Sequence, residues 1–130
     1  IVGFPGEKDE DFEETYRFLD LAPLTYFHVF SYSARPGTPA AGWKQVNDRV
    51  KKERSVKLRN LGEKKNLEYR CKFIGREMEA VVIKKHGRGA RVLTGNFIEV
   101  KAPLCQAEVK SLVSVRIMEA SPKETLGEVF

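Results

Sequence analysis

Hydrophobic and polar positions along the chain follow two different periods. From residue 9 to 21, apolar side chains recur every three or four positions (Phe12, Tyr16, Leu19), which is typical of an amphipathic helix. Asp9 is the expected N-cap of this helix. Short runs at 1–4 and 24–30 are rich in β-branched and aromatic residues and predict strands. A strand, a helix and a strand in this order predict a βαβ unit with neighbouring parallel strands.

A second, longer helix is expected from about Asp48 to Glu68, with a bend or fraying near Gly62. Its apolar stripe is sparse, and cations surround the stripe: Lys51, Lys52, Arg54, Lys57, Arg59, Lys64 and Lys65. Two interpretations of these cations remain open. They form a solvated face on a helix that links two domains, or they meet nucleic-acid phosphates.

After Phe73 the hydrophobic period becomes two. Five short strands are expected, separated by turn residues, at 77–83, 91–94, 97–101, 112–118 and 125–129. This pattern predicts a small, closed or nearly closed antiparallel β-barrel. The predicted fold class is therefore α+β, with a partial βαβ unit of a larger α/β barrel at 1–45, a linking basic helix at 46–71 and the small barrel at 72–130.

A βαβ unit alone leaves both edges of its sheet unpaired. The chain begins with Ile1, inside a predicted strand, and its 130 residues are too few for a complete (β/α) barrel. We therefore expect a piece of a longer protein. In isolation, this piece would cover its exposed sheet edges by dimerisation, by strand exchange or by disorder.

Composition and charge narrow the class of protein. No apolar run is long enough to span a bilayer, so no membrane partner is expected. Cys71 and Cys105 have no metal-ligand spacing, and two lone thiols fit a cytoplasmic location. Net charge is −4 over residues 1–43, +6 over 44–71 and +3 over 72–130. A surface that attracts polyanions is therefore expected in the second two-thirds of the chain.

One predicted hairpin concentrates residue types that bind RNA. Cations and one histidine cluster around Gly87 and Gly89, and an aromatic residue follows: Lys84, Lys85, His86, Arg88, Arg91 and Phe97. Phosphate contacts and base stacking by such residues suit single-stranded or looped RNA. The alternative is a lysine-rich hairpin tip that only protects a sheet edge.

Three segments, in order, resemble radical-SAM methylthiotransferases. Residues 1–7 read I-V-G-F-P-G-E, close to the family's I-V-G-F-P-G-E-T, with Lys8 in place of threonine. Residues 27–40 are similar to the family's H-V-F-x-Y-S-x-R-x-G-T-P-A. Four stretches near the carboxyl end resemble a TRAM domain: 73–76, 94–100, 112–117 and 126–128. Two departures are Lys110-Ser111, where a glycine often precedes the strand, and Phe97, where tyrosine is common.

The resemblance implies S-adenosylmethionine and two 4Fe-4S clusters as cofactors of the parent protein. The family's C-x-x-x-C-x-x-C loop is missing from this chain, so the chain is expected to bind no cluster, to contain no catalytic or metal-binding residue and to be inactive alone. The resemblance implies a wall of the S-adenosylmethionine pocket made by Gly3, Phe4, Pro5, Glu7, His28, Phe30, Tyr32 and Arg35.

Residue chemistry agrees with such a pocket and leaves alternatives. Small residues near Gly3 let a ligand approach the backbone, Phe30 and Tyr32 suit stacking on adenine, and Arg35 suits a carboxylate or phosphate. Core packing is the alternative for His28 and Phe30. A role in the first turn of the helix is the alternative for Glu7.

The resemblance implies a carboxyl-terminal fragment of an enzyme that adds a methylthio group to an adenosine beside the tRNA anticodon, with tRNA bound by the TRAM part. Arg35-Pro36-Gly37 favours the branch that acts on threonylcarbamoyl-adenosine. Two alternatives remain: a ribosomal-protein methylthiotransferase, and a stand-alone RNA-binding module without catalysis.

Overall fold

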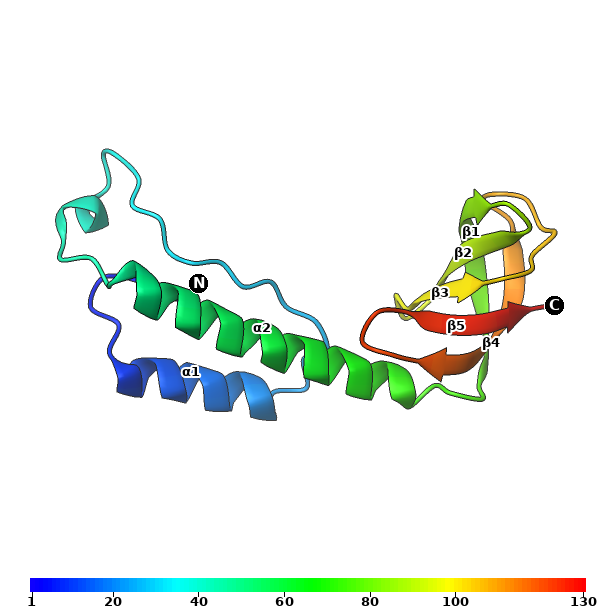
Figure 1. Cartoon of the computed structure of the whole chain (residues 1–130), viewed down its shortest axis with the longest axis horizontal. Helices are drawn as coiled ribbons and strands as arrows, with labels where there is room; N and C mark the ends of the chain where they lie inside the picture. The colour runs from blue at the N-terminus through cyan, green and yellow to red at the C-terminus, as the bar shows by residue number, and fades with distance from the viewer. The chain divides into compact units, whose positions relative to one another are not determined.

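The computed structural model describes all 130 residues, which divide into two compact units. The helical unit is Ile1–Asn66, and the barrel unit is Leu67–Phe130. Figure 1 labels the helices and strands of both. No helix combines the length and the apolar character that crossing a membrane requires.

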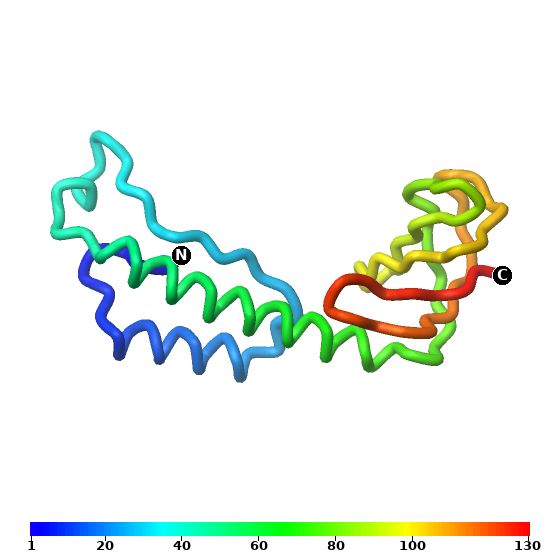
Figure 2. Tube along the Cα trace, in the orientation of Figure 1, coloured from blue at the N-terminus to red at the C-terminus, as the bar shows by residue number.

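The helical unit contains α1 (Asp9–Leu21), a short 3₁₀ helix (Pro39–Gly42) and most of α2 (Asp48–Cys71). In the tube of Figure 2, α1 and α2 run in the same direction, and the extended segment after α1 runs back along α2. Helix α1 begins one residue earlier than an N-cap at Asp9 would place it, because Lys8 is the N-cap. The Lys8 amide donates to Asp11 Oδ2 at 2.8 Å, so the capping carboxylate comes from within the first turn.

The core of the helical unit joins both helices to the amino-terminal residues. Val2, Phe12, Leu58 and Leu61 are buried, and four partly buried side chains pack against them: Tyr16, Leu19, Phe27 and Val29. The predicted apolar stripe of α1 is therefore confirmed. Helix α2 contributes two of the four buried residues, so this part of α2 belongs to the core of the unit.

The predicted parallel strand pair is present only as a single bridge between Val2 and Ser31. The Val2 amide donates to the Phe30 carbonyl at 2.9 Å, and the Tyr32 amide donates to the Val2 carbonyl at 2.7 Å. Residues 24–30 are extended but form no regular strand. Two isolated strands make too few ladder bonds to extend the pairing by themselves.

Helix α2 continues through Gly62, so the predicted bend or fraying there is wrong. A Cβ atom at Gly62 would lie 3.3 Å from Cζ of Phe27. The missing side chain makes room for the Phe27 ring against the helix. Packing therefore stabilises the helix at a residue of low intrinsic helix propensity.

The barrel unit closes five strands into a ring. They are β1 (Glu77–His86), β2 (Gly89–Thr94), β3 (Glu99–Ala102), β4 (Leu112–Ala120) and β5 (Thr125–Val129), in the order β1-β2-β3-β5-β4. The five predicted strands and the closed barrel are confirmed. One pair, β3 with β5, is parallel, which corrects the all-antiparallel expectation. An odd number of strands cannot alternate in direction all round a closed ring.

Inward-facing side chains at alternate strand positions fill the barrel. The fully buried ones include Val82, Val92, Val100, Val115 and Ile117. This alternation follows from the period-two pattern of the sequence, because successive strand residues point to opposite faces.

Gly127 offers a direct test of barrel packing. A Cβ at this position would lie 2.7 Å from the Arg116 carbonyl oxygen and 2.7 Å from Val100 Cγ1. Since neither neighbour can withdraw without moving a strand, we expect Gly127→Ala to lower the free energy of unfolding by about 2–3 kcal/mol. Urea unfolding measures this. Gly95→Ala is the control: nothing lies within 4 Å of its Cβ position, and a loss as large as that of Gly127→Ala would contradict the packing argument.

Candidate functional site

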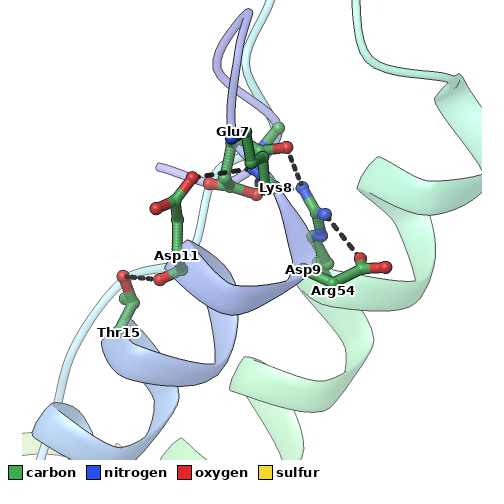
Figure 3. A network of polar contacts seen from close by, with 7 residues as sticks. Glu7, Lys8, Asp9, Asp11, Thr15 and Arg54 are labelled. Atoms are coloured by element: carbon green, nitrogen blue, oxygen red, sulfur yellow. Dashed lines mark hydrogen bonds and ion pairs between the residues drawn. The ribbon is translucent and has the colours of Figure 1, made fainter.

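A buried ion pair fixes the turn between Val2 and α1 (Figure 3). The Gly3 amide donates to Glu7 Oε1 at 3.0 Å, and Arg54 Nη1 donates to the same oxygen. Arg54 Nη1 also donates to the Glu7 carbonyl at 3.2 Å, and Nη2 donates to Asp9 Oδ1 at 2.8 Å. The Arg54 and Glu7 side chains are only 7% and 15% exposed. One guanidinium from α2 thus binds the end of the turn and the first residue of α1.

Two carboxylates compensate the cost of burying the Arg54 charge. Burial alone would lower the pKa of Arg54, but hydrogen bonds and charges from Asp9 and Glu7 raise it above its ordinary value. Because its pKa is raised in the folded state, Arg54 keeps its positive charge, and the stability that this charge contributes is lost at high pH only when the pH rises through the raised pKa.

Gly3 and Glu7, both predicted to line the cofactor pocket, contact α2. A Cβ at Gly3 would stand 2.3 Å from Lys51 Cγ, and Gly3 has φ +75°, so a glycine is required here for helix packing. The Glu7 carboxylate already binds Gly3 and Arg54. These two residues position the turn. Gly6 is its open part, because no atom lies within 4 Å of its Cβ position.

An exposed row of aromatic rings lies on the outer side of the extended segment. Tyr26, His28 and Phe30 face solvent, while Phe27 and Val29 between them face the core. The Tyr26 and His28 ring centroids are 4.9 Å apart, and those of His28 and Phe30 are 6.1 Å apart. Core packing of His28 and Phe30 is therefore excluded within this unit. We call Tyr26, His28 and Phe30 the aromatic row.

The four remaining predicted cofactor residues are Phe4, Pro5, Tyr32 and Arg35. The Phe4 ring packs edge-on against Tyr32 and Trp43, with ring centroids 5.1 Å and 6.0 Å apart. Pro5 is buried and lines an open hollow of about 430 Å³ together with Gly6, Glu7, Trp43, Lys44, Gln45 and Val46. Arg35 is exposed in the next turn, whose backbone is closed by Thr38 Oγ1 donating to the Arg35 carbonyl at 2.8 Å.

This arrangement suits a flat heterocycle. Exposed aromatic faces and the open backbone at Gly6 fit the adenine of S-adenosylmethionine, and Arg35 is a free cation at the same end. The chain holds no group of three or more His, Cys, Asp or Glu side chains placed to bind a metal ion. Its own residues therefore do not fit an iron–sulfur cluster.

The barrel carries a line of cations across three neighbouring strands. Lys84 on β1 is paired in register with Arg91 on β2, and Arg91 is paired with Lys101 on β3. All three side chains are exposed. Like charges directly opposite on adjacent strands destabilise a sheet, and carboxylates compensate two of these three cations. We call Lys84, Arg91 and Lys101 the basic row; Arg91 pairs with Glu99 at 2.7 Å and Lys101 with Glu124 at 3.1 Å.

Two of the predicted RNA-binding residues do not join the exposed cluster at the hairpin tip. Lys85 is half-buried, and its ammonium donates to the carbonyls of Cys105 and Ala107, so it anchors a loop. Phe97 lies in the turn after β2, whereas the hairpin tip precedes β2, so the ring does not join the hairpin cluster. His86 and Arg88 are exposed at the tip as expected.

Sequence reasoning missed Lys101. Its signal was available, because Lys101 alternates with the buried Val100 and Ala102 and must face outward. What could not be inferred without the strand order was its position opposite Arg91.

Four cations of α2 contact other parts of the helical unit. Besides Lys51 and Arg54, Lys57 pairs with Glu13 at 3.6 Å, and Lys65 donates to the Asp20 and Ala22 carbonyls at the end of α1. Lys65 thus satisfies the free carbonyls at a helix C-terminus. This observation weakens both sequence-based interpretations of α2, because these side chains are neither simply solvated nor free for phosphate.

Comparison with known proteins shows which class of protein this chain resembles. No protein-family profile matches the chain. The chain is 45% identical over 118 residues, 90% of its length, to the threonylcarbamoyladenosine tRNA methylthiotransferase of Aquifex aeolicus. It is 45% identical over 133 residues to the tRNA-2-methylthio-N(6)-dimethylallyladenosine synthase of Ehrlichia ruminantium and 36% identical over 137 residues to that of Wolbachia pipientis from Culex pipiens.

The chain is thus a homologue of a segment of the tRNA methylthiotransferases. The last two alignments include 98% of this chain. The chain spans only about three tenths of its relatives' length, 28% to 30% of each. One relative with each of the two named activities is 45% identical to this chain.

Proposed function

We propose that this chain is part of a tRNA-modifying methylthiotransferase that adds a methylthio group to an adenosine next to the anticodon. The observation that carries the proposal is the 45% identity to two such enzymes across nearly the whole chain. The matched segment includes both the aromatic row and the basic row. A ribosomal-protein substrate and a stand-alone RNA-binding module are the competing outcomes of the test below.

The helical unit would form one wall of the S-adenosylmethionine site, as a partial βαβ unit of a radical-SAM barrel. The parallel bridge between Val2 and Ser31 and the exposed aromatic row support this role. S-adenosylmethionine and two 4Fe-4S clusters, the latter held outside this chain, would supply the radical chemistry and the methyl group. The chain's own residues would hold the adenine, with Phe30 and Tyr32 as its contacts and Arg35 on the carboxylate.

The barrel unit, as a TRAM domain, would bind the tRNA. The basic row would meet consecutive phosphates, and Arg88 and His86 would extend it at the hairpin tip. Each phosphate contact releases condensed counterions, so binding of this kind weakens steeply as salt rises. The exposed tips of Lys84 and Arg88, with no acidic partner, support an anionic ligand at this face.

We further propose the threonylcarbamoyl-adenosine branch. This choice rests on Arg35-Pro36-Gly37, in a turn where Arg35 is exposed beside the proposed cofactor wall. The two branches differ in their substrate side chain, which carries a carboxylate in one branch and an apolar group in the other.

Nucleoside mass spectrometry tests the proposed activity. The whole protein should be expressed in cells that lack both methylthio-adenosine modifications, and the tRNA digested to nucleosides. We expect methylthio-threonylcarbamoyl-adenosine to appear, and methylthio-isopentenyl-adenosine to stay absent, relative to an empty-vector control. The second nucleoside alone would overturn the branch, and neither nucleoside would overturn tRNA methylthiolation.

A further inference from the structure

Phe97 is the most exposed large aromatic side chain of the barrel unit. It lies in the turn between β2 and β3, and its side chain is 85% exposed. Its backbone has φ +63°, in the left-handed region that favours glycine or asparagine over a bulky residue. The ring contributes to neither core. A strained backbone that presents an exposed ring points to a contact outside the chain.

A buried hydrogen-bond network holds this turn in one conformation. The Ile98 amide donates to Thr94 Oγ1 at 3.0 Å, and the Phe97 amide donates to the Thr94 carbonyl at 2.9 Å. Asn96 Oδ1 lies 2.6 Å from Thr94 Oγ1, and Asn96 Nδ2 donates to Tyr69 Oη at 3.1 Å. Tyr69 belongs to the last turn of α2, so the turn is tied to a helix. The ring is therefore preorganised, which reduces the entropy lost when a ligand binds.

The charges around this end of the barrel favour an anionic ligand. The turns before β3 and before β5 lie at the same end, because these two strands are parallel. Lys123 is exposed in the turn before β5. Glu99, at the start of β3, and Glu124, just before β5, are each paired with a cation of the basic row. Phe97 also lacks exposed apolar neighbours in its own turn (Gly95, Asn96, Ile98), unlike an aromatic residue at the centre of a protein–protein interface.

We propose that Phe97 is a stacking platform for one unpaired RNA base, held in place by Thr94, Asn96 and Tyr69 as positioning residues. This inference rests on the proposed binding of tRNA by the barrel unit. It adds a site at the end of the barrel away from the hairpin tip. The basic row would hold the phosphates, and Phe97 would select unpaired over paired nucleotides, because a base within a duplex is already stacked on both sides.

The test uses the full 130-residue chain and two probes: a short unstructured oligoribonucleotide that contains 2-aminopurine, and a duplex of the same sequence. Stacking on Phe97 should quench 2-aminopurine fluorescence. We expect Phe97→Leu to weaken single-strand binding about ten-fold and to abolish the quench, and Phe97→Tyr to preserve both. Duplex affinity and the salt dependence should stay as in the wild type. Asn96→Ala should reduce the quench while Phe97 is still present, which is the readout expected of a positioning residue.

Folding is controlled by Phe97→Asn, which suits the left-handed backbone and should leave thermal stability unchanged or higher while the quench is lost. If the wild type binds single-stranded RNA with a salt-dependent affinity and Phe97→Leu binds equally well, the stacking site is wrong and RNA binding stands. If the wild type binds neither probe, the proposed tRNA-binding function fails as well. If Phe97→Leu weakens both probes equally, the proposed selection of unpaired bases is overturned.

Discussion

Replacing Arg54 with methionine is expected to lower the free energy of unfolding of the helical unit by about 3 kcal/mol. The substitution keeps the aliphatic packing but removes the charge that compensates Glu7, whose side chain is only 15% exposed. It also removes the donor to the Glu7 carbonyl and releases the first residue of α1. Urea unfolding followed by fluorescence measures the effect, because the single tryptophan, Trp43, lies in this unit.

Arg49→Met is the matched control, since Arg49 forms an ion pair with Glu53 on the same helix but in solvent, with the two side chains 87% and 58% exposed. Exposed pairs of this kind contribute little, so the control should change stability by less than about 0.5 kcal/mol. A double variant, Arg54→Met with Glu7→Gln, should recover part of the loss because no uncompensated charge remains. Equal effects of Arg54→Met and Arg49→Met would contradict a structural role for the buried pair.

Neutralising the basic row is expected to weaken tRNA binding by about a hundred-fold at low salt. The triple variant Lys84→Gln, Arg91→Gln, Lys101→Gln removes three cations from adjacent strands and leaves Glu99 and Glu124 unpaired beside the RNA. The slope of log K against log salt should fall by about 2 to 3, because each lost phosphate contact removes about 0.7 to 0.9. Fluorescence anisotropy over a potassium chloride series measures both quantities.

The control for the basic row is a triple variant of the outer face of α2: Arg49→Gln, Lys52→Gln, Arg59→Gln. It removes the same charge from exposed positions. We expect only a small loss of tRNA affinity. A larger effect here than in the basic row would transfer the phosphate contacts to α2, the interpretation that its sequence left open.

The barrel was predictable because each strand is indicated by residues close together in the sequence. Period-two alternation with glycine and proline at the breaks identified all five strands, and β5 has the predicted bounds, Thr125–Val129. The parallel β3–β5 pair was not predictable from that pattern, because it follows from closure of the ring. Helix α1 was equally clear from its apolar spacing.

Residue roles were less predictable than elements. In β1 the register shifts between Val82 and Lys84, which is the mark of a β-bulge. Simple alternation would turn Lys85 outward and Lys84 inward; the extra residue reverses them. Lys84 therefore faces out beside Arg91, and Lys85 reaches the carbonyls of the following loop. No local pattern signals such a bulge.

The Arg54–Glu7 pair illustrates a second limit. The partners are 47 positions apart, and Arg54 is one of nine cations on a helix whose sequence looks uniformly basic. Only the packing of α2 on Val2 and Phe12 separates the buried Arg54 from its exposed neighbours. The motif residues Gly3 and Glu7 position the turn through contacts with Lys51 and Arg54 of α2.

The most direct test of the account is steady-state methylthiolation of tRNA by the whole protein that carries the neutralised basic row. Because the basic row would bind tRNA and lies outside the proposed cofactor wall, the KM for tRNA should rise about a hundred-fold while kcat stays unchanged. An unchanged KM for tRNA, or a loss confined to kcat, would contradict tRNA binding by the basic row of the barrel unit.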